Sequence, residues 1–130
     1  MEKSDRGQFN EQIRERTIKM AVDIHELFIS KTVSPITRPI INQIIRSSAS
    51  VASNYRAATR SRSDAEFYSK ICIVVEEIDE TQFWLDYLAR INLLEKTITS
   101  GILAEVDELV RLFTSIKSKM KEKIRQQAPK

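Results

Sequence analysis

Residues 63–92 read SDAEFYSKICIVVEEIDETQFWLDYLARIN and predict one long helix with two apolar faces. Ser63, followed by Glu66 three residues later, forms a capping box, which marks the first turn of a helix. A helix that is apolar on two faces needs two partners, so one bundle core does not cover this segment. At about 100° per residue, the core stripe carries Phe67, Ile71, Val74, Val75, Ile78, Gln82, Leu85 and Ala89, and the second, acidic and aromatic stripe carries Ile73, Glu77, Glu80, Trp84, Tyr87 and Ile91.

Three further helices are expected on either side of this segment. Apolar residues recur every three or four positions over about residues 8–30, 38–58 and 99–124, which is the period of an α-helix. Pro35 and Pro39 mark the loop between the first two. Four helices joined by ordinary loops favour an all-α, antiparallel up-down four-helix bundle. Its expected core is Ile13, Met20, Ile44, Val51, Phe67, Ile71, Ile78, Leu85, Val106, Leu109 and Phe113.

The composition fits one globular domain. Of the 130 residues, 42% are hydrophobic and 30% are charged, and only two glycines and three prolines occur. Such a chain is long enough for a real core and offers few breaks to its helices. We expect the bundle over residues 8–124, with flexible tails at 1–7 and 125–130.

The single cysteine, Cys72, excludes a disulfide within the chain and a cysteine-based zinc site. Because Cys72 lies in an apolar run, we expect it in the core. The first residues lack the apolar stretch of a secretory signal, and no run approaches the roughly 18 apolar residues of a membrane span. The expected compartment is the cytoplasm, with no membrane partner.

Charge is distributed in two opposite blocks. Residues 27–63 contain no Asp or Glu and carry a net charge of +6, whereas residues 64–95 carry a net charge of −6. Such blocks pair with each other, with a second copy of the chain, or with an outside polyanion. The cations of the first block are Lys31, Arg38, Arg46, Arg56, Arg60 and Arg62.

Two interpretations of these arginines stay open at this point. They pair with the acids of residues 64–95, within or between subunits, or they bind phosphates, for which the planar guanidinium is well suited. Tyr55 is the only aromatic residue in 38–62, so base stacking has little support there. The predicted nucleic-acid contacts are Arg38, Arg56, Arg60, Arg62, Lys117, Lys119, Lys121 and Lys123. The predicted subunit interface comprises Arg46, Ile73, Glu77, Glu80, Trp84 and Tyr87, with Arg46 and Arg56 as basic partners across the boundary.

Catalytic residues, metal ligands and a cofactor are not expected. The only histidine, His25, lies beside core positions of the first helix, and the paired Glu-x-x-His motifs of di-iron bundles are missing. Glu76–Glu80 (EEIDE) is better explained as an acidic face that meets arginines than as half of a metal site. No phosphate-binding glycine loop, nucleophile elbow or zinc-protease motif occurs. The sequence therefore indicates a protein that is not an enzyme.

An ordered set of polar residues also resembles a family motif. The matching positions are Gln43, Arg46, Ser50, Ser53, Asn54, Ser63, Glu66, Phe67 and, on the third helix, Glu80. In order and spacing they resemble the bacterial four-helix bundle proteins related to the intervening-sequence proteins of large-subunit ribosomal RNA genes. Many members carry a Glu-Gly pair where this chain has Ala57 and Ala58, and a Gly-Ser pair near Glu76 and Glu77. No role tied to those pairs is carried over.

The resemblance implies a four-helix bundle, a ring-like homopentamer with a positive surface or pore, and no enzymatic activity. A similar protein, the accessory variability determinant of diversity-generating retroelements, binds nucleic acid and its reverse transcriptase. A reverse transcriptase is implied as a partner here only if the gene lies beside such a retroelement. The leading hypothesis is a homo-oligomeric bundle that binds DNA or RNA through backbone phosphates. The alternative is a structural or protein-partner scaffold whose arginine-rich helix serves self-association.

Overall fold

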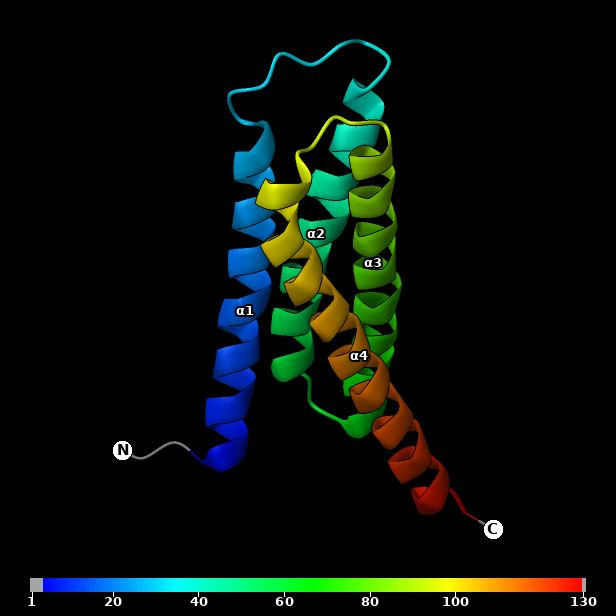
Figure 1. Ribbon diagram of the computed structural model, residues 1–130. Helices are drawn as coiled ribbons and strands as arrows, with labels where there is room; N and C mark the ends of the chain where they lie inside the picture. Colours follow the sequence, from blue (N-terminus) through cyan, green and yellow to red (C-terminus); the bar gives the residue numbers. More distant parts are fainter. Residues whose placement is uncertain (1–3, 130) are drawn as a thin grey trace.

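Four α-helices make up the protein in the computed structural model, which describes residues 4–129. The helices are α1 (Asp5–Phe28), α2 (Arg38–Thr59), α3 (Asp64–Arg90) and α4 (Lys96–Gln127). They alternate in direction, and α4 crosses the others obliquely (Figure 1). No strand occurs among residues 4–129. The predicted all-α class with four helices is confirmed.

The helix ends differ from the expected ones where local hydrogen bonds decide them. Ser4 caps α1 by accepting a bond from the Gly7 amide at 3.0 Å, so helix begins inside the expected tail of residues 1–7. Helix α4 likewise continues to Gln127, into the expected tail of 125–130. Ser4, Ala128 and Pro129 are not helical, and the remaining tail residues, 1–3 and 130, fall outside the described residues. The capping box of α3 is present, because the Ser63 hydroxyl accepts the Glu66 amide at 3.1 Å.

The core contains almost every residue predicted for it. Ten of the eleven predicted core residues are buried, and the exception, Phe67, is half-buried and packs against the core. Cys72 is half-buried as well, not buried as predicted, because its position on α3 lies outside the buried stripe. The buried core also includes Tyr55, whose ring packs on Phe113 with centroids 5.3 Å apart.

The four helices do not contact one another equally. Helix α2 packs extensively on α1 and on α3, and α3 packs on α4, whereas α1 and α4 touch over a much smaller area. One arginine links this weak seam. Arg16 Nε lies 3.2 Å from Glu105 Oε2, and Arg16 Nη2 lies 3.1 Å from Glu108 Oε1. Charged contacts from Arg16 therefore supplement the sparse packing between α1 and α4.

Candidate nucleic-acid interface and assembly surfaces

Arg46 on α2 pairs with acids of its own chain. Its Nη2 atom lies 2.8 Å from Glu80 Oε2 and 3.4 Å from Glu77 Oε2, both on α3. Hydrogen bonds to Glu80 and then to Glu77 raise the pKa of the Arg46 guanidinium above its ordinary value. The sequence-based prediction made Arg46 a basic partner across a subunit boundary. The structure pairs Arg46 within its own chain, which is one of the arrangements left open for the arginines, and its place at a subunit boundary stays a prediction.

The polar motif shared with the resembled family lies mostly where α2 meets α3. Asn54 donates to the carbonyl oxygen and the hydroxyl of Ser50, each at 2.9 Å, within α2. Between the two helices, the buried Thr81 hydroxyl donates to Ser47 Oγ at 2.9 Å. Together with the Arg46 pairs and the Ser63 cap, these bonds fix how α3 follows α2. Arg46, Ser50, Asn54 and Ser63 of the motif therefore contribute to local structure.

The other predicted cations of this segment are unpaired. Among residues 4–129, Arg38, Arg56, Arg60 and Arg62 form no ion pair, and all four side chains are exposed. They are not in one place, however. Arg38 begins α2 and Arg60 follows its last residue, so the 22 residues of the helix separate them by about 33 Å at 1.5 Å per residue. Arg38 therefore lies apart from the other predicted nucleic-acid contacts.

Cations from three chain segments gather at the end of the bundle where α2 ends and α3 begins. The start of α1, the loop between α2 and α3 and the last turns of α4 lie at this end of the bundle (Figure 1). A hollow of about 300 Å³ there is lined by Arg6, Asn10 and Arg62, among others. A neighbouring hollow of about 210 Å³ is lined by Arg6, Lys119 and Lys123. We call Arg6, Arg60, Arg62, Lys119 and Lys123 the basic end.

Within the basic end, Lys123 already forms an ion pair. Its Nζ atom lies 3.3 Å from Asp64 Oδ2, at the first residue of α3. Lys117 and Lys121 belong to the same turns of α4, Lys117 half-buried and Lys121 exposed. Arg6 was missed by sequence reasoning because residues 1–7 were assigned to a tail. The signal was available: Ser4 followed by Asp5 is a typical helix start.

The outward side of α3 carries an aromatic cluster. Trp84 stacks edge-on against Phe83, with ring centroids 4.8 Å apart, and against Tyr87, with centroids 5.6 Å apart. The Trp84 Nε1–H donates to Glu80 Oε1 at 3.3 Å. We call Phe83, Trp84, Tyr87 and Ile91 the aromatic ridge. Phe83 was missed because it falls in neither predicted stripe, although its spacing of four residues from Tyr87 places both on one side of a helix.

The predicted interface residues are thus divided. Trp84 and Tyr87 are in contact within the ridge, whereas Glu77 and Glu80 are paired with Arg46. Ile73 is half-buried and lies closer to the start of α3.

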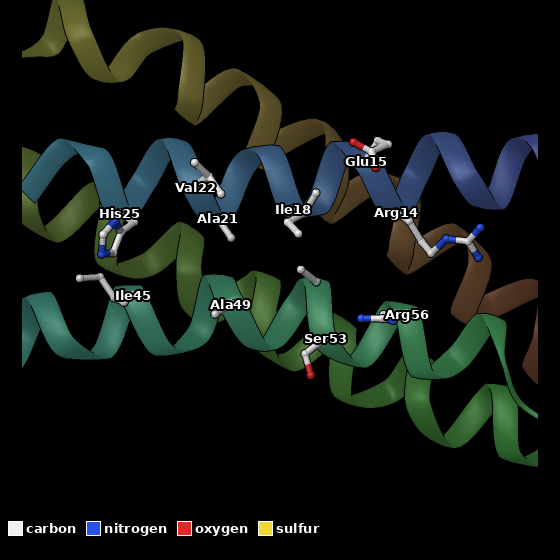
Figure 2. A pocket seen from close by; sticks show the side chains of 11 residues that line it. Arg14, Glu15, Ile18, Ala21, Val22, His25, Ile45, Ala49, Ser53 and Arg56 are labelled. Carbon is white, nitrogen blue, oxygen red and sulfur yellow. The ribbon is translucent and has the colours of Figure 1, made fainter. Parts of the chain in front are cut away.

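An open groove runs along the outer side of α1 and α2. It has a volume of about 620 Å³, and its apolar lining comprises Ile18, Ala21, Val22, Ile45, Ala49 and Ala52. Figure 2 shows Arg14 and Arg56 toward one end of this groove and His25 toward the other. Arg14 is fixed there by a hydrogen bond from Nη1 to Thr59 Oγ1 at 3.0 Å. Sequence reasoning did not find this groove.

Comparison with known proteins identifies the family of this chain. The family model described as 23S rRNA-intervening sequence protein matches residues 10–115. The chain belongs to this family. A solved structure from Bacteroides thetaiotaomicron VPI-5482, described as a protein with unknown function from the S23 ribosomal protein family, is similar. The two are 27% identical with a TM-score of 0.69, over 81% of this chain and 97% of that chain. No curated protein matches this chain.

The chain thus shares the fold of the 23S rRNA-intervening sequence protein family. The similar solved structure is described as a protein with unknown function. Neither description names an enzymatic reaction. In residues 4–129, no three His, Cys, Asp or Glu side chains are grouped to hold a metal ion. No helix in residues 4–129 has an apolar stretch long enough to cross a membrane.

Proposed function

We propose that the chain is a non-catalytic, self-associating bundle that binds the phosphate backbone of DNA or RNA through its basic end. The supporting observation is that the cations of residues 27–63, a segment without Asp or Glu, fall into a paired and an unpaired group. Arg46 is neutralised by Glu77 and Glu80, whereas Arg56, Arg60 and Arg62 have no acidic partner in residues 4–129. Unpaired guanidinium groups that face solvent retain their full charge for an outside anion.

The shape of the basic end also favours a backbone contact. Its cations come from three separate chain segments around two open hollows. Phe9, 43% exposed, offers one ring beside Arg6 and Lys119. Contacts of this kind position a nucleic acid without reading its sequence. Self-association repeats the basic end on each subunit and raises the affinity by avidity.

The test is a salt titration of binding to duplex and single-stranded DNA and RNA. Affinity should fall steeply with salt and depend little on sequence. Removing two cations of the basic end with Arg60→Ala/Arg62→Ala should weaken binding and reduce the slope of log K against log salt by about 2. The matched control is Lys31→Ala/Arg38→Ala, which removes the same charge at the other end of α2 and should leave the slope nearly unchanged.

The second candidate function is a scaffold whose charged faces serve contacts between proteins. The in-chain Arg46 pairs are its support, because they engage one arginine of α2 with acids and leave one cation fewer for an outside anion. No binding of any nucleic acid by the assembled protein at about 50 mM salt, where phosphate contacts are strong, would select the scaffold. Equal loss of affinity in both double variants would mean that net charge alone, not the basic end, carries the binding.

A further inference from the structure

The two hollows at the basic end adjoin each other but differ in the chemistry of their walls. The hollow of about 300 Å³, which we call the polar hollow, is lined among others by Arg6, Asn10, Thr59, Ser61, Arg62 and Ser63. The hollow of about 210 Å³, which we call the apolar hollow, is lined among others by Phe9, Tyr55, Phe67, Ile116 and Met120. Both walls include Arg6, Asn10 and Phe67, so the two hollows meet there.

The first turns of α1 supply a cation, an aromatic ring and an amide to these hollows. Arg6, Phe9 and Asn10 are spaced by three and four positions from Arg6, so they lie on one side of the helix. Phe9 remains 43% exposed. Much of the other wall of the apolar hollow belongs to α4, whose last turns diverge from the start of α1 (Figure 1). This divergence leaves the Phe9 ring and the apolar side of α4 open to a ligand.

The amide of Asn10 is oriented at the junction of the two hollows. Its Oδ1 atom accepts a hydrogen bond from the buried Tyr55 hydroxyl, and the two oxygens lie 3.3 Å apart. The Nδ2 group lies on the other side of the amide carbon, and within residues 4–129 it donates no hydrogen bond. An amide whose oxygen is engaged in this way has two N–H donors left for a ligand. Asn10 therefore offers a donor whose direction Tyr55 has already set.

The polar hollow has a positive balance of charge. Among the described residues that line either hollow, Asp64 is the only acid, and Lys123 Nζ lies 3.3 Å from its Oδ2 atom. Arg6 and Arg62 have no acidic partner in residues 4–129. Guanidinium groups match the oxygens of a phosphate with paired N–H donors, and Ser61 adds a hydroxyl to the same wall. The polar hollow therefore fits a phosphate.

The apolar hollow fits a nucleic-acid base only where that base is unpaired. In a duplex the bases are stacked on one another, and only their edges are accessible in the grooves. In a single strand an unstacked base has free faces, which stack on aromatic side chains. Phe9 offers such a ring directly beside Arg6, which lines both hollows. The neighbouring walls thus match the phosphate and the base of one nucleotide.

We propose that the basic end binds an unpaired nucleotide of a single strand, with its phosphate in the polar hollow and its base stacked on Phe9 in the apolar hollow. This inference rests on the nucleic-acid binding proposed above and names the form of nucleic acid that fits the site. Stacking on one ring tolerates every base, so the site selects single strands and not a sequence. Arg60 and Lys119 are left for the neighbouring phosphates of the strand.

Three nucleic acids separate the base contact from the phosphate contact. They are a single strand of about ten thymidines, within the usual site size of single-strand binders, a strand with the same backbone but no bases, and the matching duplex. The wild-type chain should bind the thymidine strand about 10-fold more tightly than the abasic strand at equal salt, as expected for stacking of one base. Fluorescence anisotropy of the labelled strands gives the dissociation constants.

Two substitutions change the two parts of the site separately. Phe9→Ala should weaken binding of the thymidine strand about 10-fold and leave the abasic strand, the duplex and the salt slope nearly unchanged, because it removes no charge. Arg6→Gln should weaken binding of all three and reduce the slope for the single strands by about 0.7. The matched control is Ile98→Ala, which removes an apolar side chain that is 56% exposed at the opposite end of the bundle and should change nothing.

A tryptophan at position 9 gives a direct signal of stacking. Phe9→Trp retains an aromatic ring and should bind the thymidine strand at least as tightly as the wild-type chain. Stacking on a base quenches indole fluorescence, so the thymidine strand should quench this variant and the abasic strand should not. The wild-type chain, whose only tryptophan is Trp84 on α3, is the reference for any change elsewhere.

The outcomes distinguish this inference from the function on which it rests. Equal affinity of the wild-type chain for the thymidine and abasic strands, or a Phe9→Ala chain that binds both as the wild-type chain does, overturns the nucleotide site and leaves phosphate binding in place. No binding of any of the three at about 50 mM salt removes the proposed function as well. Circular dichroism and sedimentation velocity check fold and assembly. If Phe9→Ala fails either check, Phe9→Leu replaces it, because leucine keeps the apolar volume without the ring.

Discussion

At the scale of single residues, Arg46 shows how one arginine acquires a structural role while its neighbours remain free. Arg46 and Arg56 are ten positions apart in a helix, yet only Arg46 faces the acids of α3. The side chain of Glu77 is only 17% exposed, so a carboxylate that has lost much of its water depends on this cation. Removing a cation from a partly desolvated acid costs more than breaking a pair in open water.

Arg46→Met should therefore lower the free energy of unfolding by about 1 kcal/mol, the upper end for exposed pairs, because two carboxylates lose their cation. Methionine retains the apolar stem, so the change isolates the charge. Arg90→Met is the matched control: within residues 4–129, Arg90 pairs only with Asp86 four residues earlier, and its loss should cost less than about 0.5 kcal/mol. Urea unfolding measures both, and equal effects would contradict the role of Glu77.

Because Tyr55 is buried, the free energy of unfolding should depend on pH in the alkaline range. Burial raises the pKa of the Tyr55 hydroxyl from 10.0 to about 12, despite the opposing effect of Arg14 and Arg6. The folded protein thus holds this proton more tightly than the unfolded chain, so the stabilisation is complete below pH 10 and is lost as the pH rises toward 12. Tyr55→Phe should remove this part of the alkaline loss in urea unfolding at several pH values. An unchanged profile would show that other groups cause the loss.

At the scale of helices, α3 is the central element, because it packs on both α2 and α4. Its buried stripe packs between α2 and α4, and its outward side carries the ridge. It ends in a Schellman turn, in which the Leu93 amide donates to the Leu88 carbonyl and the Asn92 amide to the Ala89 carbonyl. Asn92 has φ of 60°, in the left-handed region that asparagine tolerates better than most residues.

Asn92→Ala should lower the free energy of unfolding by about 1 kcal/mol, because a Cβ without a compensating local hydrogen bond disfavours the left-handed region. Asn92→Gly should be at least as stable as the wild-type chain, since glycine adopts this conformation freely. Thermal and urea unfolding of the pair provide the measurement. A stable alanine variant would mean that the loop adopts another conformation.

Gly101, inside α4, gives the opposite prediction. A Cβ built there meets no atom within 4 Å, so a side chain fits without any shift. Gly101→Ala should raise the free energy of unfolding by about 0.5–1 kcal/mol, since alanine loses less backbone entropy in a helix than glycine. Unfolding in urea tests this, and a destabilised variant would indicate that the apparent space is occupied in solution.

At the scale of the whole molecule, the bundle is continuous from α1 through α4 but nearly open between its first and last helices. Helix α1 is held mainly by α2, with Arg16 linking it to Glu105 and Glu108 of α4. The same topology collects Arg6, Arg62 and Lys119 at one end, although they are far apart in the sequence. Up-down topology thus determines both the weakest seam and the basic end.

Hydrogen exchange should reveal that seam. Helix α1 packs extensively on α2 only and touches α4 sparsely, so its amides should exchange faster than those of α3, which is packed between two helices. Arg16→Gln should speed exchange in α1 while leaving α3 nearly unchanged. Mass spectrometry of labelled peptides provides the comparison, and equal protection of α1 and α3 in both proteins would refute it.

The sequence by itself determined the four helices, the Ser63 cap and nearly the whole core, because period and capping are local properties that each segment carries. The resemblance in α2 and α3 likewise gave the family. Tertiary structure alone decided that Arg46 pairs within the chain, that Arg38 lies away from the basic end, and that Arg6 belongs to it. It also decided that Ile18, Val22 and Ala49 share a groove. Those properties depend on how each helix is rotated and which helices are neighbours, and small differences in rotation leave the apolar period unchanged.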